Sequence, residues 1–351
     1  MLDGLIISID AMGGDDAPDI VVQGIEYFLT HEGEGRHARF LLHGDAEKLA
    51  PLLAKSPRTR ERSEVFHTDQ VVNMEDKPSQ ALRKGKGSSM WNAVASVKGG
   101  QAGVVVSAGN TGAFMAMSKL QLRPKQGVQR PALAASWPNM AGGMSIVLDV
   151  GANVECDASQ LTEFAILGEA YFRALYGKKC PTVGLLNVGT EDGKGNAVVK
   201  VAHERLSQSR LGIDYIGFVE GYDISKGTVD VVVTDGFTGN IALKTAEGTA
   251  KLVDSFVKKA LLGNLWSKFT SALNSLSLRK LRRSLDPRRA NGAVFLGLNG
   301  IAVKSHGGTD RIGFSTALNI ATGLAESDFQ KELDDRLNAL HDEDDNIGFI
   351  S

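Results

Sequence analysis

The 351-residue chain has few of the residues that would mark it as secreted, low in complexity or bound to nucleic acid. It contains only two cysteines, Cys156 and Cys180, which are too few for a disulfide framework and fit a reducing cytoplasm. We expect both to be buried small hydrophobic residues. The nine prolines, against forty glycines, argue against low complexity, and a net charge of −2 gives no sign of nucleic-acid binding.

Long apolar runs are also missing. No stretch approaches the roughly 18 apolar residues that a membrane-spanning helix needs. The first 15 residues carry acidic side chains early and lack the apolar run of a signal peptide. We therefore expect a soluble, cytoplasmic protein, although such a protein could still lie on a membrane surface.

Several familiar catalytic motifs are absent. The chain has no G-x-G-x-x-G, G-x-x-x-x-G-K-[ST], H-E-x-x-H, G-x-S-x-G or C-x-x-C. Their absence weakens interpretations as a dinucleotide-binding protein, a nucleoside-triphosphatase, a zinc protease or a serine hydrolase.

The chain does have a recurring order of short apolar run, glycine-rich turn and amphipathic segment. Strands are predicted over 5–10, around 41–42, and over 65–67, 103–109, 145–151, 182–189, 215–221 and 230–236, with helices over 159–176 and 197–211. Apolar strands alternating with helices predict parallel pairing, with helices covering the sheet. The expected fold is one three-layer α/β/α domain over 1–351 with a mostly parallel sheet.

Polar and glycine-rich loops follow these strands, where open α/β sheets bind ligands. The loop after the first strand offers Asp10, Gly13 and Gly14, and its carboxylate could bind a metal, orient a base or simply form a turn. The next such loop could cradle an anion on free helix-start amides, or be a capped turn. Its candidate residues are Ser107, Gly109, Asn110, Thr111 and Gly112.

Three later loops have the same layout. In the loop 187–196, Lys194 could neutralise a phosphate or an oxyanion, or be an ordinary solvated lysine. The loops after it could be explained by helix capping or by ligand binding. The candidates are Asn187, Thr190, Gly193, Gly195 and Asn196 in 187–196, Asp235, Thr238, Gly239 and Asn240 in 235–240, and Ser305, His306 and Asp310, which follow Lys304.

Six segments together resemble the PlsX family of phosphate acyltransferases. They are IDAMGGDDAP (9–18), SAGNTGA (107–113), LDVGAN (148–153), LLNVGTEDGKGN (185–196), VTDGFTGNIALK (233–244) and GLNGIAVKSHG (297–307). The resemblance implies transfer of a long-chain acyl group from acyl carrier protein to inorganic phosphate, giving an acyl phosphate that a glycerol-3-phosphate acyltransferase would consume. It also implies a phosphotransacetylase-like fold, a homodimer, and neither a metal nor an organic cofactor.

The resemblance also suggests roles for the loops. Phosphotransacetylases place a serine, a cation and an aspartate near their last strand, and by similarity Ser305, His306 and Asp310 take those places, with His306 where those enzymes have an arginine. Lys194 is the further catalytic candidate. The loops 107–112, 187–196 and 235–240 would hold phosphate and the pantetheine end of the donor. The reaction would then proceed by direct attack of phosphate on the thioester.

Residues 247–289 differ from the rest, because they show helical spacing and no strand signal. Their apolar stripe and basic residues suit a membrane interface, an acidic carrier protein or a dimer contact. The contact candidates are Leu261, Trp266, Phe269, Arg279, Lys280, Arg282 and Arg283. We expect a protruding segment there, and a peripheral position on an anionic membrane. Two alternatives remain open, a short-chain phosphotransacetylase that uses acyl-CoA and a non-catalytic membrane-associated scaffold.

Overall fold

The fold is built around one long mixed sheet, which the computed structural model describes over residues 4–31, 37–191, 193–262 and 287–347. Its strand order is β3-β2-β1-β4-β11-β10-β5-β6-β9-β7-β8. The strands are β1 (Ile6–Asp10), β2 (Arg39–Gly44), β3 (Ser63–His67), β4 (Val104–Ser107), β5 (Ala132–Pro138), β6 (Met144–Leu148), β7 (Thr182–Leu186), β8 (Asp214–Val219), β9 (Val231–Val233), β10 (Ala293–Leu296) and β11 (Ile301–Lys304).

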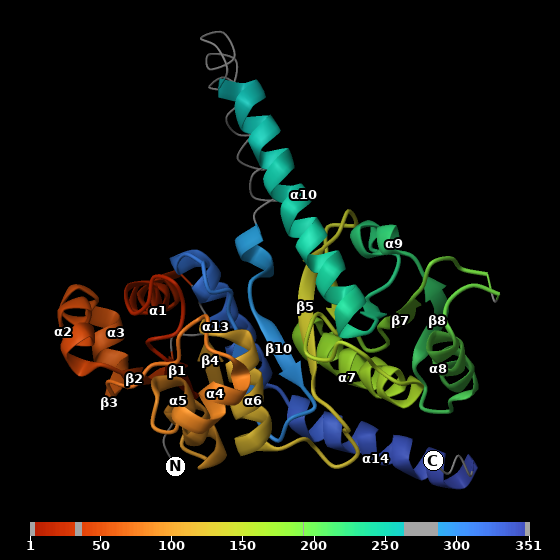
Figure 1. Ribbon diagram of the computed structural model, residues 1–351, viewed down its shortest axis with the longest axis horizontal. Helices are drawn as coiled ribbons and strands as arrows, with labels where there is room; N and C mark the ends of the chain where they lie inside the picture. Colours follow the sequence, from red (N-terminus) through yellow and green to blue (C-terminus); the bar gives the residue numbers. More distant parts are fainter. Residues whose placement is uncertain (1–3, 32–36, 192, 263–286, 348–351) are drawn as a thin grey trace.

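Helices cover the sheet on both sides, so the predicted three-layer α/β architecture is confirmed (Figure 1). They are α1 (Asp19–His31), α2 (Ala46–Lys55), α3 (Pro57–Arg62), α4 (Pro78–Lys84), α5 (Ser89–Lys98), α6 (Thr111–Leu122), α7 (Ala158–Tyr176), α8 (Ala197–Gln208), α9 (Gly221–Lys226), α10 (Gly236–Leu262), α13 (Arg311–Glu326) and α14 (Phe329–Ile347), with a 3-10 turn η2 (Pro287–Ala290).

Two hydrophobic cores lie on the two faces of the sheet. Alternate residues of a strand point to opposite faces, and in β4 Val104 and Val106 join one core while Val105 joins the other. The first core is closed by α1, α7 and α13, and the second by α5, α6 and α9. Burial on both faces explains why the strands read as continuous apolar runs.

The sheet is mostly parallel, as predicted, but its direction changes in the middle. Seven strand pairings are parallel, and three antiparallel pairings join β11 to β10, β10 to β5 and β5 to β6. The strands β5 and β10 were not among those predicted. As a result the loops after β1, β4 and β11 and the loops after β6, β7 and β9 form two separate groups.

The helix α10 starts well before the predicted segment 247–289 and runs without interruption from Gly236 to Leu262. It extends away from the body of the molecule (Figure 1), and it exposes the apolar side chains of Leu252, Val253 and Phe256. Within the described residues, no helix is long and apolar enough to cross a membrane. Leu261 is half-buried. The other predicted contact residues of this segment, Trp266, Phe269, Arg279, Lys280, Arg282 and Arg283, lie outside the described residues.

Candidate active site

Three neighbouring strands bring a serine, an aspartate and a lysine into register at their carboxyl ends. In the pairing register Ser107 lies opposite Asp10 on one side and opposite Lys304 on the other. Ser107 Oγ donates to Asp10 Oδ2 at 2.7 Å and accepts from the Gly109 amide at 3.0 Å. We define the Lys304 cluster as Asp10, Ser107, Lys304 and Ser305, and all four side chains are buried.

Lys304 belongs to the motif GLNGIAVKSHG (297–307), from which no role was predicted for it. Its side chain is only 7% exposed, and its ammonium donates to the carbonyls of Ala108, at 3.3 Å, and of Ser305. Burial lowers the pKa of Lys304 to about 8, against the opposing effect of Asp10 and Asp15. A lysine so placed ties together the two loops that follow β4 and β11.

Asp10 is the anionic partner in the Lys304 cluster. Burial raises its pKa, although the hydroxyls of Ser89 and Ser107 and the nearby Lys304 oppose this. Its Oδ1 is buried without a hydrogen-bond partner. Gly13 packs directly against the Asp10 carboxylate and the Gly109 amide, where a β-carbon would not fit. Gly14 has φ of +117°, which favours glycine.

Ser305 is held by a residue that no local sequence pattern indicates. Asn291, which precedes β10, donates from Nδ2 to Ser305 Oγ at 2.8 Å and accepts the His306 amide on Oδ1 at 2.9 Å. The Ser305 amide donates to the Ser107 carbonyl at 2.9 Å. Asn291 therefore orients the loop after β11 from a neighbouring strand.

The other two candidates in this loop are exposed or structural. His306 is exposed, and its Nδ1 accepts from the Gly308 amide at 3.2 Å. Partial burial lowers its pKa, with Glu247 opposing and Lys244 assisting. Asp310 caps α13 by accepting from the amides of Ile312 and Gly313, and it forms a 2.7 Å ion pair with Arg288.

Burial would raise the pKa of Asp310, but these contacts outweigh it and hold the pKa below its usual value. Capping and ion pairing account for Asp310 without any contact with a substrate.

The start of α6 borders the Lys304 cluster. Asn110 Oδ1 accepts from the Ala113 amide at 3.0 Å, and its Nδ2 donates to the carbonyls of Met74 and Asp76. The amides of Thr111 and Gly112, in the first turn, have no acceptor within the helix. Such amides attract anions. Gly109 and Gly112 allow close packing against Met90 and Pro78.

The remaining candidates lie in the second group of loops, where Asn196, Asp235 and Thr238 help to line a pocket of about 430 Å³. Asn196 caps α8, Asp235 accepts from the amide and the hydroxyl of Thr238, and Asn240 donates to the Val150 carbonyl. Gly239 packs against the Asp149 backbone, and Gly195 against Asn187. Lys194, Thr190 and Gly193 are exposed.

The helix α10 connects the two groups. It begins at the carboxyl end of β9, beside the 430 Å³ pocket, which Phe237 and Thr238 help to line. Further along it, Lys244 lowers the pKa of both Lys304 and His306. Lys244 of α10 therefore lies close enough to the loop after β11 to interact electrostatically with its residues.

The cysteines differ from expectation. Cys180 is exposed and Cys156 is half-buried, so the prediction that both are buried is wrong. Burial raises the pKa of Cys156 to about 12, and the carboxylates of Asp149, Asp235 and Asp157 act in the same direction. Because the thiolate is the nucleophile, Cys156 is a poor one at neutral pH.

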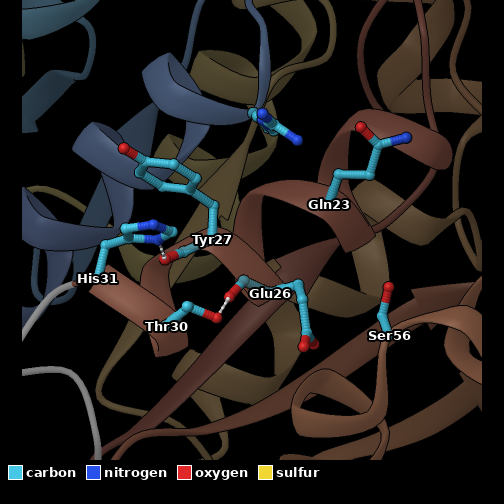
Figure 2. Close-up of a pocket in the computed structure, with 7 residues that line it drawn as sticks. Gln23, Glu26, Tyr27, Thr30, His31 and Ser56 are labelled. Atoms are coloured by element: carbon cyan, nitrogen blue, oxygen red, sulfur yellow. Dashed lines mark hydrogen bonds between the residues drawn. The ribbon is translucent and has the colours of Figure 1, made fainter.

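A second pocket, of about 280 Å³, lies beside α1 and contains none of the candidate residues. Figure 2 shows Tyr27 and His31 stacked at its edge, with Glu26 and Ser56 opposite. Arg311 completes it and lies over the Tyr27 ring. Within the residues that the structure describes, no group of three or more histidine, cysteine or acidic residues is placed to hold a metal ion.

Solved structures with a similar fold include phosphotransacetylases and a dehydrogenase. The chain matches the Streptococcus pyogenes phosphotransacetylase with a TM-score of 0.61 and 16% identity, over 92% of this chain and 94% of that one. The Staphylococcus aureus EutD phosphotransacetylase gives 0.58 and 17%, over 92% and 95%. The 4-hydroxythreonine-4-phosphate dehydrogenase of Klebsiella pneumoniae gives 0.52 and 13%, over 93% and 99%. These likenesses define the fold class.

Sequence comparison identifies the family. The family described as "Fatty acid synthesis protein" matches residues 5–332. Relatives named phosphate acyltransferase include that of Maricaulis maris, 56% identical over 93% of both chains, and that of Caulobacter vibrioides, 55% identical over 97% of this chain and 93% of the relative. The chain belongs to the PlsX family of phosphate acyltransferases, enzymes of fatty acid and phospholipid synthesis.

Proposed function

We propose that this chain transfers a long-chain fatty acyl group from acyl carrier protein to inorganic phosphate. A phosphate oxygen attacks the thioester carbonyl carbon, the carbon–sulfur bond breaks, and the proton of hydrogen phosphate passes to the departing thiolate. The products are an acyl phosphate and the free carrier thiol. Because phosphate is itself the nucleophile, the enzyme has to position it, offset its charge and stabilise the oxyanion.

The observation that carries this proposal is the buried ammonium of Lys304 beside the free amides of α6. A cation and helix-start amides together favour a dianion such as hydrogen phosphate. Groups whose pKa is shifted by burial and by a specific charged partner cluster at functional sites. In the proposal, Ser305 and His306 border the phosphate, and Lys194 supplies positive charge near the thioester from the second group of loops.

The cysteines support direct attack over an acyl-enzyme intermediate. With a pKa raised to about 12, Cys156 has very little thiolate at neutral pH. Cys180 is exposed on the segment before β7, at the opposite end of that strand from the loop 187–196. We therefore assign neither sulfur a covalent role.

We further propose that the enzyme acts as a homodimer, receives its donor on the basic 247–289 segment, and lies against an anionic membrane. There it would release acyl phosphate to a glycerol-3-phosphate acyltransferase. The exposed apolar side chains of α10 support membrane contact, since each can contribute about 1.5–3 kcal/mol when buried.

Replacing both Leu252 and Phe256 with aspartate should release the protein from anionic vesicles and spare activity on soluble donor. The matched control is Leu120→Asp, at an exposed leucine on α6. Conversion of the double variant into inactive monomers would show that this stripe is a dimer contact, and the membrane proposal would fail.

The donor distinguishes the proposed function from its alternatives. Thiol release should be measured with hexadecanoyl-carrier protein and with acetyl-CoA, each with and without phosphate. We expect phosphate-dependent release from the carrier protein and little from acetyl-CoA. Preference for acetyl-CoA would identify a short-chain phosphotransacetylase, and no release from either donor would favour a non-catalytic scaffold.

A further inference from the structure

The 430 Å³ pocket has an apolar wall that the capping contacts around it do not explain. Its apolar side chains come from four segments: the loop after β6, the start of α7, the start of α8 and the start of α10. They are Val154, Leu161, Val198, Val199 and Phe237. We call this cavity the Phe237 pocket. Its volume falls in the range of small-molecule sites, about 300–1,000 Å³.

Two large apolar side chains stand exposed at the rim of the Phe237 pocket. Val154 is 66% exposed and Phe237 is 60% exposed, while Leu161, which also lines the pocket, is buried. A hollow with apolar walls that continues into exposed apolar side chains is typical of a ligand site. The pocket therefore suits a ligand that carries an apolar portion and enters from solvent.

The charges around the Phe237 pocket decide which ligand suits it. Glu155 and Asp235 line it. Cys156 also lines it, and the nearby carboxylates of Asp149, Asp235 and Asp157 raise the pKa of its thiol. A phosphate dianion is repelled by this surrounding, whereas an uncharged hydrocarbon chain is not. The Lys304 cluster has the opposite character, with a buried ammonium.

The two places are joined by α10. Phe237 lines the pocket. Lys244, seven residues later, lies close enough to His306 and Lys304 for its charge to lower the pKa of both. At 1.5 Å per residue this is about 10 Å along the helix axis. An extended sixteen-carbon chain is longer than that, so a chain held in the pocket can reach toward the loops after β11.

We propose that the Phe237 pocket binds the fatty acyl chain of the donor and so sets the chain-length preference of the enzyme. This inference rests on the proposed function, because it assumes a long-chain acyl donor. The pocket takes the uncharged methylene groups, and the phosphate is held elsewhere, at the Lys304 cluster.

Filling the pocket tests this inference. The variants are Val199→Trp, from a half-buried side chain of α8 that lines the pocket, and Val154→Trp, whose exposed position tolerates a larger residue. The matched control is Val201→Trp on the same helix, where the valine is 43% exposed and does not line the pocket. For each protein, kcat/KM is measured with butanoyl-carrier protein and with hexadecanoyl-carrier protein.

Each tryptophan in the pocket should exclude roughly two to three methylene groups, at about fourfold in binding for each. We expect kcat/KM for the hexadecanoyl donor to fall by about 15- to 60-fold in at least one pocket variant, and for the butanoyl donor by less than about twofold. The Val201→Trp control should match the wild type with both donors. The short donor also reports whether each variant remains folded and active.

Two results would overturn the inference while leaving the proposed function intact. One is full activity of both pocket variants on the hexadecanoyl donor, and the other is an equal loss on both chain lengths in both variants. If the wild type makes no acyl phosphate from any acyl-carrier protein, it is the proposed function that fails.

Discussion

Replacing Lys304 with methionine should separate stability from activity, because the ammonium is costly to bury. Lys304→Met keeps a long unbranched side chain and removes the charge. The fall of the lysine pKa from 10.5 to about 8 corresponds, at 1.36 kcal/mol per unit, to about 3 kcal/mol. That is the cost of holding the charged form in the folded protein at neutral pH.

The effect has a definite dependence on pH. Below about pH 8 Lys304 carries its proton in both the folded and the unfolded chain, and above about pH 10.5 in neither. Between these values only the unfolded chain binds the proton, so the free energy of unfolding rises with pH. Relative to Lys304→Met, the wild type should therefore gain about 3 kcal/mol of stability across this window.

The assay is denaturant-induced unfolding of both proteins at several pH values from 7 to 10.5, with Lys98→Met as a control at an exposed lysine on α5. The difference in free energy of unfolding between the wild type and the control should not change with pH. In parallel, Lys304→Met should lose on the order of a hundredfold in kcat/KM at pH 7, mainly through the KM for phosphate. Equal pH dependence in wild type and Lys304→Met, or a fully active variant, would refute this reasoning.

Three further predictions concern the other candidates. Lys194→Ala should lower kcat/KM by on the order of a hundredfold, about 2.7 kcal/mol, without unfolding the protein, and an active variant with an unchanged phosphate KM would remove Lys194 from the mechanism. Cys156→Ala combined with Cys180→Ala should retain most activity, and an acyl group trapped on either sulfur during turnover would exclude direct attack. Asp310→Ala should destabilise the fold by about 1 kcal/mol through loss of the cap, and Asp310→Asn should keep both cap and activity. Loss of activity in a stable Asp310→Asn would instead support a catalytic carboxylate, and kinetics with thermal unfolding distinguish the two.

Much of the fold could be predicted because its strands are buried on both faces. Continuous apolar runs such as 103–109 identify β4, and glycine-rich turns mark where each strand ends. The strands β5 and β10 are different, because each pairs antiparallel with both neighbours and lacks the strand–loop–helix order that identified the others. Without them the reversal of direction in the sheet cannot be inferred.

The positions of the candidate residues, in loops at strand ends, could be predicted more easily than their roles. Pattern alone placed Ser305 and Ser107 correctly at strand ends, and the structure brings them together through the register of β4 and β11. Asn291 contacts Ser305 only through tertiary packing, so no local pattern reports it. Lys304 was visible as a cation ending an apolar strand, and that conflict between charge and expected burial was the available signal.

Transfer of the acyl group to inorganic phosphate can be followed by measuring both products of the reaction. Hexadecanoyl-carrier protein is incubated with the enzyme and radiolabelled phosphate, and free carrier thiol and labelled acyl phosphate are both quantified over time. We expect the two products to form one for one, and neither to form when phosphate is omitted. Release of thiol without labelled hexadecanoyl phosphate would contradict the proposed reaction.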